Sequence, residues 1–251
     1  MADHTTYGLV CSELSEDLSK TNLGELKLDS FQDNSVKIKI KAASLNFPDL
    51  LMTQGKYQNR PNLPFALGME GAGIVEKVGS GVSSLKEGDE VMFGGWGHGA
   101  IAESIILPEG LVSLKPKSLN FSEAASFKTA YLTAYVGLIR RGELKQGETL
   151  LVHGASGGVG MAAVQMGKLY GARVIASGTS NEKLKIVKTW GADEIINTGL
   201  EGSVSFREEV KDLTEGKGAD VIYDPVGGDV FDESIRCINW GGRLLIIGFT
   251  S

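Results

Sequence analysis

The chain is poor in the residues that build disulfide frameworks and thiolate metal sites. It has only two cysteines, Cys11 and Cys237, in 251 residues. Cysteines this few and this far apart exclude a disulfide framework and a clustered thiolate site, and they favour a reducing compartment. We expect both to be buried as small apolar side chains.

Long apolar runs and an excess of positive charge are also missing. No apolar run is long enough to span a bilayer, and the start MADHTTYG is too polar for a secretory signal and has no arginine for a mitochondrial presequence. The 31 acidic residues outnumber 25 Lys and Arg and give a net charge of −6, which argues against a broad nucleic-acid or anionic-membrane surface. We therefore expect a cytoplasmic protein that binds neither nucleic acid nor membrane.

The first half of the chain has the rhythm of β-strands. Val36, Ile38 and Ile40 alternate with lysines, which is the period of a strand with one face in water. Further short apolar runs follow, separated by glycine-bearing turns such as residues 78–89. The pattern predicts an antiparallel, barrel-like domain over residues 1–118.

From residue 119 onward, helical and strand patterns alternate. Asn120 or Ser122 is a candidate cap for a helix that Gly142 would end. Apolar strands are predicted at 149–154, 172–177, 193–197, 219–224 and 242–249. Helical segments are predicted at 161–170, 181–190, 203–215 and 229–240, and they end near Gly171, Gly191, Gly216 and Gly241. Four such crossovers predict an α/β fold, with a doubly wound parallel sheet of Rossmann type over residues 119–251.

Residues 154–160, GASGGVG, lie between the first predicted strand of this sheet and the helix that follows. There Gly157 would let the backbone approach a pyrophosphate, and Gly160 would let the helix pack closely on the strand. The helix N-terminus adds free N–H groups and a positive dipole. Ala155 stands in place of the first glycine of the usual motif. This context predicts a dinucleotide site.

The end of the second predicted strand indicates which dinucleotide is bound. An NAD-specific site usually has Asp or Glu there, to accept a hydrogen bond from the ribose 2′-OH. This chain has the uncharged residues 177–180, SGTS, followed by Lys183 on the next helix. Small donors and a cation suit a 2′-phosphate, so we favour NADPH. The alternative is that Ser180 only caps a helix and Lys183 is a solvated surface charge.

Residues 147–168, GETLLVHGASGGVGMAAVQMGK, resemble the signature of the quinone oxidoreductase branch of the medium-chain dehydrogenase/reductase superfamily, the branch of the zeta-crystallin relatives. The similarity runs from about residue 8 to the end and includes residues 43–91, 224–231 and 241–249. It implies a GroES-like N-terminal catalytic domain and a cleft between two domains. It also implies NADPH-dependent hydride transfer to a quinone or an α,β-unsaturated carbonyl, usually in a homodimer.

Zinc is not expected. Zinc-dependent members of the superfamily carry Gly-His-Glu where this chain has Gly68-Met69-Glu70, and a methionine in that place is a poor zinc ligand. The histidines His4, His98 and His153 show no ligand spacing with the cysteines. His153 ends a predicted strand, and we expect it to be packed in the core.

The resemblance also assigns the site residues. Tyr57 would donate a hydrogen bond to a developing oxyanion, and Asn46 would orient the substrate or nicotinamide; the alternatives are a half-buried aromatic and a turn-stabilising asparagine. Asp49 is expected to cap a helix. The resemblance places the cofactor on Ala155, Ser156, Gly157, Gly158, Val159, Gly160, Thr133, Thr179, Ser180, Lys183, Val226, Gly248 and Phe249.

The sequence ends with the fifth predicted strand of the Rossmann half, where members of the family continue with a sixth strand and return to the catalytic domain. We therefore expect an incomplete dinucleotide domain. Two function classes stay open. One is a zinc-free NADPH-dependent reductase of quinones or enones, and the other is a catalytically inactive NADPH-binding scaffold or structural protein.

Overall fold

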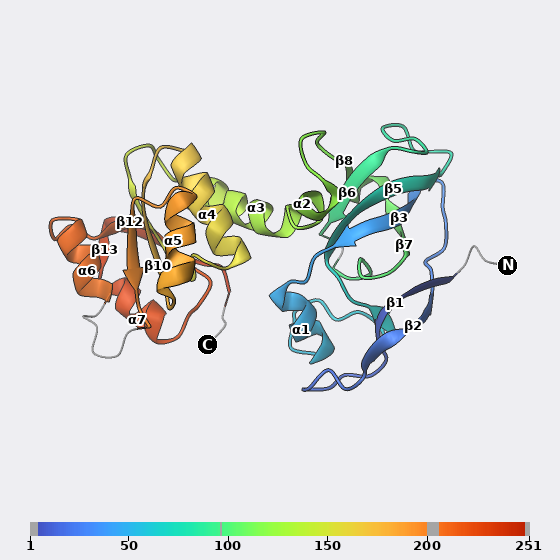
Figure 1. Cartoon of the computed structure of the whole chain (residues 1–251), viewed down its shortest axis with the longest axis horizontal. Coiled ribbons are helices and arrows are strands. Elements are labelled where there is room, and N and C mark those ends of the chain that lie inside the picture. The colour runs from blue at the N-terminus through green and yellow to red at the C-terminus, as the bar shows by residue number, and fades with distance from the viewer. Residues whose placement is uncertain (1–4, 96, 200–205, 249–251) are drawn as a thin grey trace. The chain divides into compact units, whose positions relative to one another are not determined.

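The computed structural model describes residues 5–95, 97–199 and 206–248. The chain divides into two compact units, Met1–Thr129 and Ala130–Ser251 (Figure 1). This division falls later than residue 118 because α2 (Phe121–Ala125) belongs to the first unit. Its Ala124 and Ala125 are buried in a cluster with Ala72 of that unit.

The first unit is built from two antiparallel sheets. β1 (Thr5–Cys11), β2 (Thr21–Lys27) and β4 (Phe65–Ala66) form a sheet in the order β2-β1-β4. The second sheet has the order β7-β3-β5-β6-β8 and consists of β3 (Ser35–Ala43), β5 (Glu70–Val78), β6 (Glu90–Gly94), β7 (Ser104–Pro108) and β8 (Val112–Leu114). A short helix α1 (Phe47–Thr53), a 3-10 turn η1 (Glu109–Leu111) and α2 are the helical parts of this unit. The predicted GroES-like antiparallel fold is confirmed.

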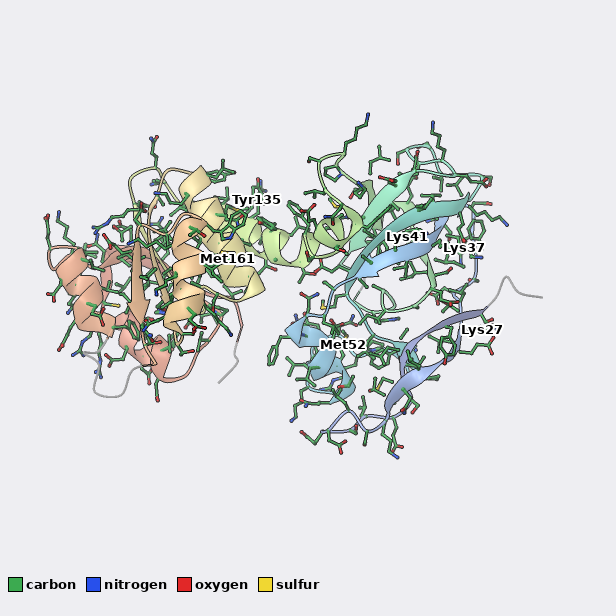
Figure 2. The ribbon with its side chains drawn as sticks, viewed as in Figure 1. Lys27, Lys37, Lys41, Met52, Tyr135 and Met161 are labelled. Carbon is green, nitrogen blue, oxygen red and sulfur yellow. The ribbon has the colours of Figure 1, made fainter. Side chains whose placement is uncertain are left out.

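The alternating pattern of β3 separates the core from solvent as predicted. Val36 and Ile38 are fully buried in the core of the larger sheet. Lys37 and Lys41, labelled in Figure 2, are half-buried and exposed, respectively. Because strand side chains alternate between faces, this register is fixed by the buried pair.

The second unit contains the predicted five-stranded parallel sheet. Its strands are β9 (Thr149–Val152), β10 (Arg173–Gly178), β11 (Glu194–Asn197), β12 (Ala219–Asp224) and β13 (Ile238–Ile246), in the order β11-β10-β9-β12-β13. The helices are α4 (Gly158–Leu169), α5 (Asn181–Thr189), α6 (Phe206–Leu213) and α7 (Asp229–Ile235). The strand order reverses at β9, so the crevice between the ends of β9 and β12 is the topological switch point.

The two faces of this sheet are covered by different helices (Figure 1). Leu150 and Val152 of β9 pack with residues of α4 on one face. Leu151 points to the other face, where it packs with residues of α6 and α7. Most positions in the middle of these strands are apolar, as expected for a parallel sheet covered on both sides. No helix in the described part of the chain has the length and apolar character needed to cross a bilayer.

The single helix predicted from residue 120 to 142 is interrupted. α2 is followed by α3 (Lys128–Tyr135), which continues as a π-helical segment η2 (Val136–Arg141). Asn120 is the cap of α2, accepting the Glu123 N–H at 2.9 Å, and Gly142 ends the π-helical segment. The break separates two packing environments: Ala124 and Ala125 of α2 are buried in a cluster of the first unit, and Ala134 of α3 is buried in a cluster of the second.

The prediction was also wrong for residues 238–240, which belong to β13 rather than to a helix. α7 ends at Ile235, and Ile238 already pairs with Ala219 of β12. Gly241, with φ +75°, therefore lies inside β13 instead of ending the helix. The pairing with β12 outweighs the helical pattern of the isolated segment.

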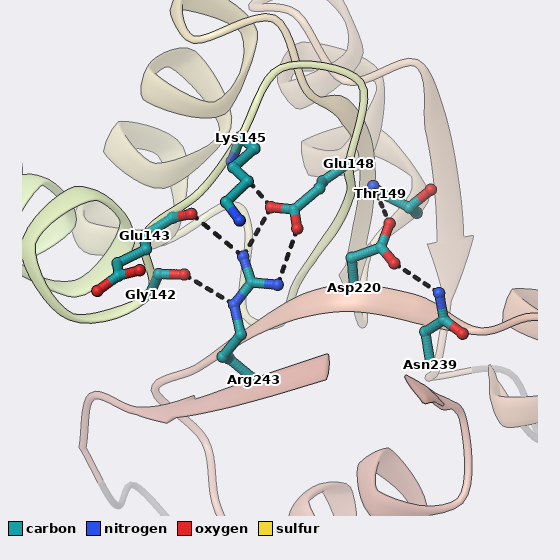
Figure 3. Close-up of polar contacts among 8 residues, drawn as sticks. All are labelled: Gly142, Glu143, Lys145, Glu148, Thr149, Asp220, Asn239 and Arg243. Carbon is teal, nitrogen blue, oxygen red and sulfur yellow. Dashed lines mark hydrogen bonds and ion pairs between the residues drawn. The ribbon is translucent and has the colours of Figure 1, made fainter. Parts of the chain in front are cut away.

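Polar contacts hold the amino-terminal edge of the sheet together (Figure 3). Arg243 of β13 binds both carboxylate oxygens of Glu148 at 2.7 and 2.8 Å and donates to the Gly142 carbonyl at 2.8 Å. This bidentate pair lowers the pKa of Glu148. Asp220 of β12 accepts from the Thr149 N–H at 2.8 Å. The central strands are thus fixed at the edge opposite the predicted cofactor turn.

Candidate cofactor-binding site

The glycine turn lies where β9 ends and α4 begins, at the carboxyl edge of the parallel sheet. The backbone reverses at Gly154, whose φ of +54° is in the left-handed region that favours glycine. The Gly154 carbonyl accepts the Gly157 N–H at 2.9 Å, and the Ala155 N–H donates to the Ser177 carbonyl at 3.0 Å. Ala155 is fully buried. The turn is therefore anchored to β10, the neighbouring strand.

Two glycines of the turn lack a side chain for different reasons. A Cβ built on Gly160 would collide with the carbonyl oxygen of Gly154 and lie 2.8 Å from the Cα of Ala155. A Cβ built on Gly158 would have no atom within 4 Å. At Gly157 it would lie 3.3 Å from the Gly154 oxygen. Close packing thus explains Gly160, whereas the space beside Gly158 is open to a ligand.

The first turn of α4 contains backbone N–H groups that have no side-chain cap. Gly157 is the N-cap, and no side chain caps the 12-residue helix. The Met161 N–H makes the first intrahelical bond, to the Gly157 carbonyl at 2.8 Å. The N–H groups before it, on Gly158, Val159 and Gly160, have no acceptor within an α-helix. Together with the helix dipole they suit a phosphate group.

The end of β10 lies beside this turn. A Cβ built on Gly178 would be 4.0 Å from Oγ of Ser156, and the exposed Thr179 follows directly. Ser180 is the N-cap of α5 and accepts the Lys183 N–H at 3.4 Å. It therefore has the capping role that we gave as the alternative to phosphate binding. The Lys183 side chain is exposed and forms no ion pair with any residue in the described ranges. The structure thus brings the turn and the predicted 2′-phosphate segment together.

Val226 and Gly248 reach the same edge of the sheet. Cγ2 of Val226 is 3.4 Å from the position of a Cβ on Gly154, and a Cβ on Gly248 would lie 3.7 Å from the Pro225 carbonyl. The buried Asp224 carboxylate shapes this turn by accepting the N–H groups of Val226 and Gly227 at 2.8 and 3.1 Å. The ends of β9, β12 and β13 therefore meet around Gly154.

The other predicted cofactor residues are less closely tied to the turn. Thr133 is half-buried on α3, and its neighbour Ala134 is fully buried in the same cluster as Ala155. Tyr135 and Met161, labelled in Figure 2, lie on α3 and α4 of this unit. Phe249 lies outside the residues that the structure describes.

His153, directly before the turn, is a buried histidine with both ring nitrogens hydrogen-bonded. It is 1% exposed, with Nδ1 2.7 Å from Oγ of Ser177 and Nε2 2.9 Å from Oγ of Ser234. Burial lowers its pKa to about 4, although the Asp224 carboxylate acts in the opposite direction. The expected core histidine is confirmed. Ser177, in contrast, faces this ring and not the exposed edge where a 2′-phosphate would be bound.

In the first unit, Asn46 belongs to a polar cluster around a buried carboxylate that sequence reasoning did not single out as functional. Glu70 is 1% exposed. It accepts from Oγ of Ser44 at 2.6 Å, from Nδ2 of Asn46 at 3.1 Å and from the Thr129 N–H at 2.7 Å. Asn46 Nδ2 also lies 3.0 Å from Oγ of Ser44. The sequence signal that could have indicated this buried carboxylate is that Glu70 is the one acidic residue in the otherwise small and apolar run EGAGIV.

Asn46 also begins α1 as its N-cap, with Asp49 completing a capping box. Oδ2 of Asp49 accepts the Asn46 N–H at 2.8 Å, and its Oδ1 accepts the Gly68 N–H at 3.0 Å. Burial raises the pKa of Asp49. Asp49 therefore caps the helix as expected, and Asn46 has the turn-stabilising role in addition to any contact with a ligand.

Tyr57 is half-buried after the end of α1. Its ring packs against a cluster that contains Met52 and Phe65; Met52 is labelled on α1 in Figure 2. No described residue makes a hydrogen bond with its hydroxyl group. Tyr57 is therefore the half-buried aromatic that we gave as the alternative to a catalytic role, and its hydroxyl group is also available as a donor.

Two cavities are lined by none of the predicted site residues. One of about 160 Å³ is lined by Arg173, Asp220 and Asn239 at the amino ends of the parallel strands, the edge opposite that used by ligands in open α/β sheets. The other, of about 470 Å³, is in the first unit beside His98. Within the described ranges, no group of three or more His, Cys, Asp or Glu is placed to hold a metal ion.

Comparison with known proteins gives matches to both units. Residues 32–117 match the family described as alcohol dehydrogenase GroES-like domain, and residues 158–251 match the family described as zinc-binding dehydrogenase. The chain is 38% identical to a quinone oxidoreductase-like protein 2 homolog of Nematostella vectensis, covering 97% of this chain and 65% of that protein. It is 34% identical to quinone oxidoreductase-like protein 2 of Rattus norvegicus, covering 96% and 67%, respectively.

Solved structures give the same result. A quinone oxidoreductase of Pseudomonas syringae has a TM-score of 0.90 at 33% identity, covering 97% of this chain and 74% of that one. The quinone oxidoreductase of Escherichia coli complexed with NADPH has a TM-score of 0.85 at 31% identity, covering 98% and 74%.

The chain therefore has the architecture of the medium-chain dehydrogenase/reductase superfamily, a GroES-like unit followed by a Rossmann-type unit. Within that superfamily it belongs to the quinone oxidoreductase-like proteins. It spans about two-thirds of the length of the curated relatives it matches. The predicted fold and family are confirmed, whereas the roles of the individual site residues stay predictions.

The two glycines give opposite predictions for an alanine substitution. Gly158→Ala should change the free energy of unfolding by less than about 1 kcal/mol but lower NADPH affinity at least about tenfold, because the new methyl group enters the open space. Gly160→Ala should lower the free energy of unfolding by about 1–3 kcal/mol through the clash with Gly154. Urea denaturation and calorimetric titration measure both. Unchanged NADPH affinity in Gly158→Ala would place the cofactor elsewhere.

His153 should make stability depend on pH. Its pKa is about 4 in the folded chain and about 6.5 unfolded, so the unfolded state binds the proton first. The stabilisation is fully present above pH 6.5 and is lost as the pH falls toward 4. From pH 7 to pH 5 the wild type should lose about 2 kcal/mol more than His153→Gln, as measured by urea denaturation. Equal losses in both proteins would show that His153 titrates normally.

Proposed function

We propose that this chain binds NADPH at the carboxyl edge of the second unit's sheet and uses it to reduce a quinone or an α,β-unsaturated carbonyl without zinc. The observation that carries the proposal is the uncapped first turn of α4 beside Gly158. A Cβ on this glycine would meet no atom within 4 Å, and the three N–H groups of the first turn have neither a side-chain cap nor an acceptor within the helix. A pyrophosphate is the ligand that such a turn suits.

The preference for NADPH rests on the residues at the end of β10. Thr179 is exposed, Ser180 caps α5, and Lys183, which forms no ion pair within the described part of the chain, follows on the first turn of that helix. A carboxylate at the end of β10 would accept from a ribose 2′-OH but repel a 2′-phosphate. The neutral hydroxyls and the cation favour the phosphate.

When bound, the nicotinamide would supply the hydride. The chain's own residues hold the cofactor and orient the substrate. Tyr57 is the proposed donor to the oxygen of the substrate, where negative charge develops. Nδ2 of Asn46 is held by Ser44 and Glu70, so Asn46 is proposed to orient the substrate or nicotinamide from a fixed position. Quinones are electrophilic enough that positioning supplies much of the rate.

The zinc-free part of the proposal rests on Met69 and Glu70. Met69 packs in the apolar cluster with Met52 and Phe65. The carboxylate oxygens of Glu70 are already occupied by hydrogen bonds from the chain itself. Neither residue is placed as a ligand for zinc, which needs free N, S or O donors in tetrahedral arrangement.

The state of the protein in the cell stays a prediction from the sequence. We propose a cytoplasmic protein whose partner is a small-molecule substrate, and a homodimer as the family resemblance implies. A cofactor-binding protein without turnover is the alternative, because the chain spans only part of the relatives whose activity is invoked.

Cofactor selectivity is predicted to depend on Lys183. Lys183→Glu should weaken NADPH binding about tenfold or more, because it replaces a cation with a repelling anion, and should leave NADH binding within about twofold. Titration by tryptophan fluorescence quenching measures both constants. Lys185→Glu on the same helix is a matched control, since it makes the same charge change at another exposed position. If both substitutions change NADPH affinity equally, Lys183 acts only as a general surface charge and does not bind the 2′-phosphate.

Turnover is predicted to depend on Tyr57. The wild type should oxidise NADPH in the presence of ortho- or para-quinones or enones, and Tyr57→Phe should lower kcat about tenfold or more with NADPH affinity unchanged. Absorbance at the NADPH band follows the reaction. NADPH binding without oxidation by any of these acceptors would favour the non-enzymatic alternative.

A further inference from the structure

We propose that Ser177 and His153 form a positioning pair that fixes the pyrophosphate turn relative to the 2′-phosphate segment. The inference rests on the proposed function, since it concerns the same NADPH site. It assigns a role to two buried residues that do not touch the cofactor themselves.

Ser177 is connected to both parts of the site. Its carbonyl accepts the N–H of Ala155 in the turn at 3.0 Å, and its hydroxyl lies 2.7 Å from Nδ1 of His153 directly before the turn. The next residues along β10 are Gly178 and Thr179, where the 2′-phosphate segment begins. One residue, 2% exposed, thus joins the two subsites through its backbone and through its side chain.

The hydrogen positions in this network follow from Ser234. Its hydroxyl donates to the Val230 carbonyl at 2.7 Å, which uses its only hydrogen. Oγ of Ser234 must therefore accept from Nε2–H of His153, 2.9 Å away. A neutral ring with hydrogen on Nε2 has an acceptor at Nδ1, so Ser177 is the donor there. Every hydroxyl and ring nitrogen in the chain of contacts is then satisfied.

The ring of His153 cannot easily turn away from Ser177. The Phe206 ring packs edge-on against it at 5.0 Å between centroids, and Ser234 of α7 holds the far nitrogen. The hydroxyl of Ser177 is therefore hydrogen-bonded to a ring that its packing against Phe206 keeps in place. Without this hydrogen bond, the distance between the pyrophosphate turn and the 2′-phosphate segment should change. The structure within each of the two subsites should change less.

A ligand that spans both subsites reports on their spacing. The affinity gained by linking two binding groups depends on whether both sites can be reached together. Adenosine 2′,5′-bisphosphate carries phosphates for both subsites, whereas 2′-AMP and 5′-ADP each carry phosphate for one. A change in spacing should therefore lower the affinity for the bisphosphate and leave the affinities for 2′-AMP and 5′-ADP unchanged.

The test compares Ser177→Ala with Ser234→Ala, which remove equivalent buried hydroxyls from opposite sides of the same ring. Ser177→Ala should lower the affinity for the bisphosphate about fivefold to tenfold. It should leave the affinities for 2′-AMP and 5′-ADP within about twofold of the wild-type values, as measured by ligand-observed NMR titration. Ser234→Ala leaves the ring packed against Phe206 and bound to Ser177, so this variant should have a similarly lowered melting temperature and bind all three ligands like the wild type. Unchanged bisphosphate affinity in Ser177→Ala, or an equal loss for all three ligands, would overturn the proposal.

A second pair of variants covers the case in which Ser177→Ala does not fold. His153→Asn places an acceptor near the position of Nδ1, and His153→Gln places an amide near that of Nε2. The proposal expects the weakened bisphosphate binding in His153→Gln and not in His153→Asn, and the reverse order contradicts it. If the wild type binds none of the three ligands, the proposed cofactor site itself fails. If the wild type binds the ligands and the variants bind them equally well, only the positioning role of Ser177 and His153 is rejected.

Discussion

The close approach of α4 to the end of β9 is the contact on which the second unit's proposed chemistry depends. It is possible only because Gly160 has no side chain against the Gly154 carbonyl. A helix that starts this close to the strand directs its free N–H groups at the switch point of the sheet. The anion site is therefore a consequence of packing, and the open space beside Gly158 is the part that packing does not require.

Buried polar side chains keep the two units' candidate site residues in place. In the second unit His153 is held by two serines below the turn. In the first unit Glu70 holds Ser44 and Asn46. Buried polar groups of this kind are costly unless every partner is satisfied. Both networks therefore fix the positions of nearby residues without needing to contact a ligand.

The sequence allowed the parallel sheet, the glycine turn and the family to be predicted, because these depend on short-range periodicity and on a contiguous motif. The early start of β13 could not be predicted, since its pairing with the distant strand β12 decides it. The break between α2 and α3 could not be predicted either, since the two helices bury their alanines in different core clusters. The same holds for the buried networks: Ser177 and Ser234 lie 24 and 81 residues from His153. No local pattern indicates that such residues meet, so the hydrogen bond between Ser177 and His153 could not be predicted.

The central claim is that the first turn of α4 and the start of α5 together hold a phosphorylated dinucleotide. Backbone amide chemical shifts of the ¹⁵N-labelled chain, recorded with saturating NADPH and then with NADH, test it most directly. We predict that the amides of residues 158–160 move with both cofactors and that those of residues 179–183 move only with NADPH. Shifts confined to other residues, or the same shifts at 179–183 with both cofactors, would contradict it.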